Sequence, residues 1–155
     1  METRACMRYL VDNPGPSYLR LGKAGEPVFH LSPPEVSRGC WIRVRNGNEE
    51  RVLLTTGAVL QIAMERIEQS HFAIYSMPLW SMADKVAQAH ALRTRSHVMT
   101  IEDHLFDGGF GSWLLEARSA DQTLACVVSN IALNSEVCGT VGTQATLNRL
   151  GGLTT

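Results

Sequence analysis

From residue 40 onward, runs of apolar residues alternate with segments that have the spacing of amphipathic helices. Residues 41–45 alternate apolar and polar side chains, which predicts a half-exposed edge strand ending at a turn at Asn46-Gly47. The next run, Arg51–Thr56, is nearly all apolar and is typical of a strand buried on both faces. Further buried strands are predicted at residues 72–77, 97–102 and 124–129.

Helical spacing occurs between and after these strands. Residues 58–69 repeat apolar side chains at helical intervals, with charged residues on the other face. Ser81 and Asp84 fit a capping box for a helix that runs to about Ala91. Two more helices are predicted at Phe110–Ala117 and Thr143–Leu150, the latter ending at Gly151-Gly152.

The region before residue 40 has a different composition. Residues 9–38 are rich in proline, glycine and serine, which predicts turns and linker around one short extended run, Ser17–Leu21. Beyond it, strands and helices alternate with connections short enough to require right-handed crossovers. The pattern therefore predicts an α/β protein, a three-layer α/β/α domain with a mainly parallel sheet.

Composition narrows the class of protein. The 155 residues are 45% hydrophobic and 19% charged, as in one globular domain. No apolar run approaches the ~20 residues of a membrane-spanning helix, and the first nine residues lack the apolar core of a signal peptide. The net charge is -1 and the arginines are scattered. We therefore expect a cytoplasmic protein that binds neither nucleic acid nor membrane.

The cysteines and histidines give no strong signal of a metal site. Cys6, Cys40, Cys126 and Cys138 are far apart and form no Cys-x-x-Cys pair. We expect them to be reduced and mostly buried, with a zinc site as the alternative. The histidines are separated by element boundaries and do not have metal-ligand spacing. No metal ligands are predicted.

Two predicted strand ends carry polar residues or glycines. In open α/β sheets, ligands bind at the carboxyl ends of strands where the winding direction reverses. One such end is Thr55-Thr56-Gly57, and the other is Glu102-Asp103-His104 with the glycine-rich segment that follows it. The candidate ligand-binding residues at these two ends are Thr56, Gly57, Glu102, His104, Gly108, Gly109, Gly111 and Ser112.

Three interpretations of the second strand end stay open. The free N–H groups at the helix start favour an anion, but the G-G-x-G spacing is not a nucleotide motif and no lysine or arginine lies in the loop. Glu102 and His104, two residues apart, could face one side of the sheet as an acid–base pair. Alternatively, the glycines only permit a tight turn between strand and helix, capped by Asp103 or Asp107.

Four ordered motifs occur along the chain, "VLLTTG" (52–57), "YSMPLWSMAD" (75–84), "VMTIEDHLFDGGFGS" (98–112) and "GTQATLNRLGGLT" (142–154). Together they closely resemble the C-terminal domain of the transketolase family. Pro78 and Asp84 keep the family's spacing of an Asp six residues after Ser-Met-Pro, whereas Met82 replaces a frequent second proline. Gly151 likewise replaces a frequent aromatic residue. The segment "GPSYLRLGK" (15–23) resembles the last strand of the preceding pyrimidine-binding domain.

The resemblance implies a definite architecture. It predicts a five-stranded mixed sheet of order 1-3-2-4-5, in which the first strand, about 40–46, is antiparallel to the others. The winding would reverse between the strands ending at Thr56 and Glu102. Residues 1–35 would be a linker and a remnant of the pyrimidine-binding domain, and residues 36–155 the C-terminal domain.

The resemblance also implies a function. In this family thiamine diphosphate is held between two other domains, and the acidic metal motif and the G-D-G cofactor signature are absent from this sequence. We therefore expect a non-catalytic domain that binds no cofactor alone, in an enzyme that uses thiamine diphosphate and Mg2+ for two-carbon ketol transfer. It would serve dimer packing and a regulatory ligand site, as a homodimer.

The implied partners are catalytic domains of the same enzyme or of a separate subunit. An interaction subunit that docks onto separately encoded catalytic domains is one alternative. A second alternative, from a different class, is a free-standing anion- or nucleotide-binding module that uses the helix start at Gly108–Ser112.

Overall fold

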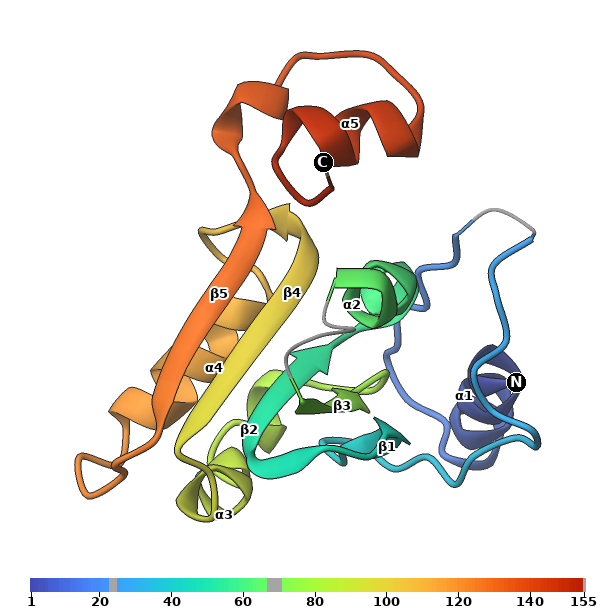
Figure 1. The fold of residues 1–155 in the computed structure, drawn as a ribbon. Coiled ribbons are helices and arrows are strands. Elements are labelled where there is room, and N and C mark those ends of the chain that lie inside the picture. The colour runs from blue at the N-terminus through green and yellow to red at the C-terminus, as the bar shows by residue number, and fades with distance from the viewer. Residues whose placement is uncertain (23–24, 67–70, 155) are drawn as a thin grey trace.

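A mixed five-stranded sheet forms the centre of the computed structural model, which describes residues 1–22, 25–66 and 71–154 (Figure 1). Its strand order is β1-β3-β2-β4-β5. β1 is antiparallel to β3, and the other pairs are parallel. The predicted fold class, strand order and direction of the first strand are therefore confirmed. The strands are β1 (Ile42–Arg45), β2 (Asn48–Thr55), β3 (Phe72–Ser76), β4 (His97–Leu105) and β5 (Val127–Leu133).

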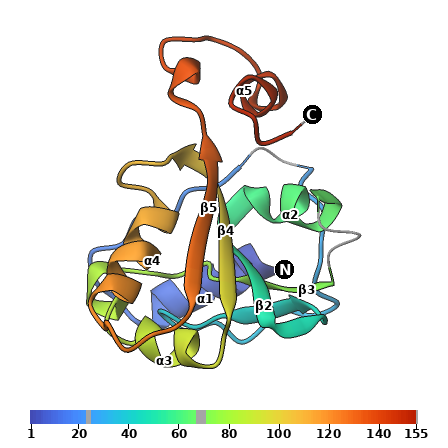
Figure 2. The same cartoon turned by 60° about the vertical axis from the view of Figure 1, so that its left-hand side comes forward.

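Helices cover both faces of the sheet. α2 (Leu60–Arg66) lies on one face, and α3 (Gln88–Arg93) and α4 (Phe110–Ser119) lie on the other (Figure 2). α1 (Glu2–Asp12) and α5 (Gln144–Leu150) are the first and last helices among the described residues. Three short 3-10 helices complete the elements, η1 (Gly57–Val59), η2 (Met82–Asp84) and η3 (Ser135–Val137).

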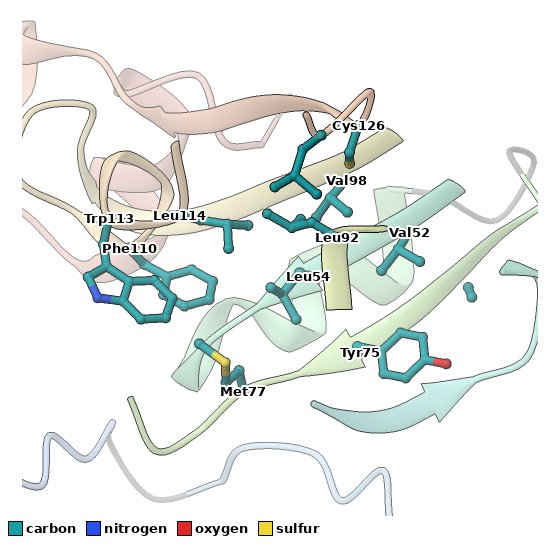
Figure 3. Close-up of a cluster of buried hydrophobic side chains, with 12 residues drawn as sticks. Val52, Leu54, Tyr75, Met77, Leu92, Val98, Phe110, Trp113, Leu114 and Cys126 are labelled. Carbon is teal, nitrogen blue, oxygen red and sulfur yellow. The ribbon is translucent and has the colours of Figure 1, made fainter. Parts of the chain in front are cut away.

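The core consists of two layers because successive side chains of a strand point to opposite faces. Val52 and Leu54 of β2 belong to the layer under α3 and α4, while Leu53 between them belongs to the layer under α2. Figure 3 shows the first layer, in which Phe110 and Trp113 of α4 stack with ring centroids 5.8 Å apart. The continuous apolar runs of the sequence thus correspond to strands buried on both faces.

The last strand begins later than predicted. The apolar run at 124–129 predicted a strand there, but β5 covers Val127–Leu133. Leu124 and Cys126 are buried in the connection before the strand. Arg118 of α4 holds this connection, since its guanidinium donates to the carbonyl oxygens of Cys126 at 3.2 Å and Leu124 at 3.1 Å. A buried apolar run was therefore mistaken for the strand itself.

The predicted capping box at Ser81 and Asp84 is wrong. The Ser81 hydroxyl donates to the Asp84 carboxylate at 2.7 Å, and no side chain caps the 3-10 helix that begins there. Arg38 Nε also donates to Asp84, at 2.8 Å. Asp84 therefore ties this segment to the loop before β1, and the α-helix itself starts only at Gln88.

The other helix boundaries differ in smaller ways. The helix predicted at 58–69 starts as η1 and continues as α2, and residues 67–69 of that prediction lie outside the described residues. The last helix is confirmed, with Thr143 Oγ1 accepting the Thr146 N–H at 3.2 Å. The strand predicted at 97–102 continues to Leu105, so Glu102 lies within β4 rather than at its end.

The N-terminal region contains a helix that the composition did not indicate. α1 occupies Glu2–Asp12 and buries Ala5 and Cys6, so it overlaps the start of the predicted linker. The extended run predicted at Ser17–Leu21 forms no strand. We call residues 1–30 the N-terminal arm.

We predict that replacing Asp84 with Asn lowers the free energy of unfolding by about 2 kcal/mol, because two hydrogen bonds to a buried charged acceptor are weakened. Urea denaturation measures this change. The matched control is Glu116→Gln, which alters an ion pair with Lys85 whose glutamate is 63% exposed and which should cost less than about 1 kcal/mol. Equal effects of the two variants would contradict the role of Asp84.

Candidate functional site

The glycine-rich segment after β4 brings the start of α4 against the side chain of Glu102. Glu102 Oε2 accepts the Phe110 N–H at 2.6 Å, and Oε1 accepts the Gly111 N–H at 2.8 Å. The Glu102 residue is only 2% exposed. Free N–H groups at a helix start attract an anion, and here the chain supplies that anion itself. The structure therefore favours the third interpretation, a tight turn between strand and helix.

Two of the glycines are required by close approach. A Cβ on Gly109 would lie 2.1 Å from Glu102 Oε2, so a side chain there would displace the carboxylate. A Cβ on Gly111 would lie 2.4 Å from the side chain of Asn130 and 2.6 Å from Thr100 Oγ1. Only glycine lets α4 start this close to β4 and β5. These contacts account for the G-G-x-G pattern without a nucleotide.

Glu102 and His104 do not form an acid–base pair. Both carboxylate oxygens of Glu102 are engaged by backbone N–H groups, while the exposed His104 ring places Nδ1 2.9 Å from the carbonyl oxygen of Leu105. Burial raises the pKa of the Glu102 carboxyl above 4.5, and the hydrogen bonds from Gly111 and Phe110 partly offset this rise. A buried and doubly bonded carboxylate has a structural role in this position.

The remaining candidate residues lie around the adjacent ends of β2 and β4, since the register pairs Thr55 of β2 with Ile101 of β4. The Ser112 hydroxyl donates to the carbonyl oxygen of Gly109 at 3.2 Å. Gly108 is exposed and has a φ of 73°, as expected for the turn. Thr56 is extended and precedes η1, and Gly57 follows it with a φ of 64°. The eight predicted residues therefore belong to two adjacent strand ends, and ligand binding by them remains a prediction.

The sequence analysis missed a polar cluster at the carboxyl end of β3. Glu2 Oε1 accepts a hydrogen bond from the buried Ser76 hydroxyl at 2.9 Å, and Glu2 Oε2 lies 3.1 Å from Nε2 of His30. These contacts attach the start of α1 to the sheet. Glu2 and Ser76 are 74 residues apart, and no local pattern in the sequence indicates that they meet.

A second contact attaches the N-terminal arm to β4. Arg20 donates through both terminal nitrogens to the Asp103 carboxylate, at 2.9 Å each. The sequence contained one signal for this placement. Successive side chains of a strand point to opposite faces, so Asp103 was expected to point away from Glu102. Asp103 therefore binds the arm. It does not form the cap of the turn that the third interpretation offered for it.

A small pocket lies between the N-terminal arm and the start of α2. It has a volume of about 110 Å3. Of the eight candidate residues it includes only Gly57, and its other polar lining comes from the arm and α2, namely Glu2, Thr3, Arg20, Glu26, His30 and Gln61. Two of these side chains already have partners, since Arg20 is paired with Asp103 and His30 lies beside Glu2.

The described residues contain neither a metal-ligand cluster nor a membrane-spanning helix. Within residues 1–22, 25–66 and 71–154, no three His, Cys, Asp or Glu side chains are grouped as they would be around a metal ion. None of the helices described is long and apolar enough to cross a membrane. All four cysteines are free. Cys6 and Cys126 are buried as expected, but Cys40 and Cys138 are exposed.

Comparison with known proteins gives one informative result. No protein-family model and no curated protein matches the sequence. Among solved structures, the chain is similar to one described as "Split gene transketolase, inactive beta4 tetramer", with a TM-score of 0.77 and 24% sequence identity. The chain has the fold of a transketolase C-terminal-like domain. The match covers 97% of this chain but 50% of the solved one, so the chain spans half the length of that structure.

The transketolase-like fold includes the N-terminal arm. A match over 97% of the chain leaves only a few residues unmatched, so most of the arm superposes on the solved structure as well. The boundary predicted at residue 35 remains a prediction.

We predict that Glu102→Ala lowers the free energy of unfolding by about 2–4 kcal/mol, because two buried N–H groups at the start of α4 lose their acceptor. Asp107→Ala is the matched control, since Asp107 is an exposed acid in the same loop and should change stability by less than about 0.5 kcal/mol. Chemical denaturation at pH 7 compares the two. A loss below 1 kcal/mol for Glu102→Ala, on the order of one neutral hydrogen bond, would refute the assigned role.

Proposed function

We propose that this chain is the C-terminal domain of a thiamine-diphosphate-dependent, transketolase-like enzyme. It is non-catalytic by itself and contributes to dimer packing, and the complete enzyme performs two-carbon ketol transfer. The observation that carries the proposal is the fold match over 97% of the chain. The motifs at 52–57, 75–84, 98–112 and 142–154 support it.

The internal pairing of the polar groups at the sheet edge supports a non-catalytic role. Glu102 is bound by the amides of α4, Glu2 by Ser76 and His30, and Asp103 by Arg20. The sequence also lacks an acidic metal motif and the G-D-G signature. In this proposal thiamine diphosphate, Mg2+ and the activating glutamate are all held by other domains.

The N-terminal arm is the proposed contact with those catalytic domains. Its segment 17–22 belongs to no helix or strand, and Tyr18 is 89% exposed and Leu21 59% exposed. Large exposed apolar side chains on such a segment suit a surface that another domain covers. The catalytic domains can belong to the same polypeptide or to a separate subunit. The regulatory role is assigned to the pocket beside Gly57, which admits only a small ligand.

We predict that titration of the isolated chain with thiamine diphosphate and Mg2+ gives no saturable heat in a calorimeter. The reason is that the groups expected to bind the diphosphate and metal are absent from this sequence. A complete transketolase titrated in the same buffer is the positive control. Saturable binding, or turnover of a ketose phosphate by the chain alone, would overturn the non-catalytic assignment.

We predict that the tagged chain co-purifies with a protein carrying the G-D-G signature, identified by mass spectrometry. Leu21→Asp should lower the recovery at least tenfold, because it places a charge in the proposed contact. Val141→Asp is the matched control, since Val141 is 98% exposed and lies far along the chain, before α5. Equal recovery with both variants would remove the arm from the proposed contact.

A further inference from the structure

One edge of the sheet lacks the features that normally prevent strand addition. β5 is the last strand in the sheet order, and within residues 1–22, 25–66 and 71–154 no strand runs along its outer side (Figure 1). Its seven residues, Val127–Leu133, include no charged residue and no proline. Unprotected edges of this kind pair readily with another strand. The outer edge of β5 is therefore a surface that needs a partner.

The backbone groups on that edge can be assigned from the register. The Val127 N–H donates to the carbonyl oxygen of Ser96 at 3.0 Å, so the backbone groups of Val127 face β4. Because the direction alternates along a strand, the N–H and C=O groups of Val128, Asn130 and Ala132 point away from β4. Three successive donor–acceptor sets thus face outward, and the last of them, at Ala132, lies beside the irregularity in the β4–β5 pairing.

The opposite edge of the sheet is protected. β1 has four residues, two of which are Arg43 and Arg45. Its pairing with β3 is interrupted by a bulge or irregularity between these two arginines. Short length, positive charge and a bulge are the usual devices against strand addition. β5 differs from β1 in length and in charge, while its own pairing with β4 is irregular only near its end, between Ile101 and Leu105 of β4.

We propose that β5 pairs in antiparallel fashion with β5 of a second copy of this chain, which joins two five-stranded sheets across a two-fold axis near Asn130. The proposal deepens the dimer packing proposed above and rests on it. Two identical uncharged strands can approach without repulsion. A head-to-tail contact between β5 and β1 would instead meet the arginines and bulge of β1 and would leave both ends open.

The pairing is consistent with the side chains along β5. With the axis at Asn130, Val128 lies opposite Ala132 of the partner subunit, and Asn130 lies opposite its own copy. The three outward pairs formed in this way exchange about six backbone hydrogen bonds. On the other face, Val127 lies opposite the partner's Leu133. Val127 is 59% exposed in the monomer, and the pairing covers it. The two copies of α4 would lie side by side on one face.

The first experiment measures mass by light scattering. We expect wild type to have at least twice the 17.0 kDa mass of the chain. Val127→Lys, which places a charge on the edge, should halve the mass of the assembly. Val141→Lys is the matched control, because it makes the same change at another exposed valine and should leave the mass unchanged.

A second variant tests the backbone. Ala132→Pro removes an outward N–H but no N–H that faces β4, so the β4–β5 pairing is retained. It should also halve the mass, and circular dichroism checks that each variant is folded. If Ala132→Pro fails to fold, Val127→Lys decides. A monomeric wild type, or a folded edge variant that keeps the wild-type mass, overturns the proposal.

Hydrogen exchange identifies the surface and separates this inference from dimer packing in general. The amides of Val128, Asn130 and Ala132 should exchange at least tenfold more slowly at a concentration where the dimer forms than after dilution to monomer. The amides of Val127 and Ser129 face β4 and should be protected at both concentrations. A dimer in which the three outward amides exchange rapidly would retain dimer packing but refute its location on β5.

Discussion

The hydrogen bonds between the Glu102 carboxylate and the first amides of α4 determine how the carboxyl edge of the sheet is built. They place a negative charge at the positive end of the helix and draw α4 against β4. Gly109 and Gly111 are needed because a side chain at either position would meet Glu102, Asn130 or Thr100. The glycine-rich segment that most resembles a ligand-binding loop therefore binds a carboxylate of the same chain. Function is accordingly expected at the surfaces of the protein that contact partners.

The strands were predictable because a strand that is buried on both faces appears in the sequence as a continuous run of apolar residues. The runs at 51–56 and 72–77 correspond to β2 and β3, which lie inside the sheet and pack on both layers. The strand order and the antiparallel first strand came from the resemblance alone. The prediction was wrong for β5, because Leu124 and Cys126 are buried in the core layer under α3 and α4 although they precede the strand.

The candidate site was predicted less well, and the reason is distance along the chain. Glu102, Gly109 and Gly111 were selected correctly as neighbours because they are close in sequence, although their role is structural. The pairs Glu2–Ser76 and Arg20–Asp103 join segments 74 and 83 residues apart. Arg20 lies in the proline- and glycine-rich region, which has no periodic signal, and nothing in the sequence around Glu2 indicates its distant partner, so neither attachment could be inferred from the sequence.

The short separation between Glu102 and the amides it binds has a consequence for how the protein folds. Phe110 is eight residues from Glu102, so joining them closes a small loop at little entropic cost. The β4–α4 unit can thus assemble early from contacts within one stretch of chain. The arm must instead wait for strands that are synthesised much later, because its attachment sites on β3 and β4 follow it by more than 70 residues. During synthesis the arm would remain open to other proteins until the sheet is complete.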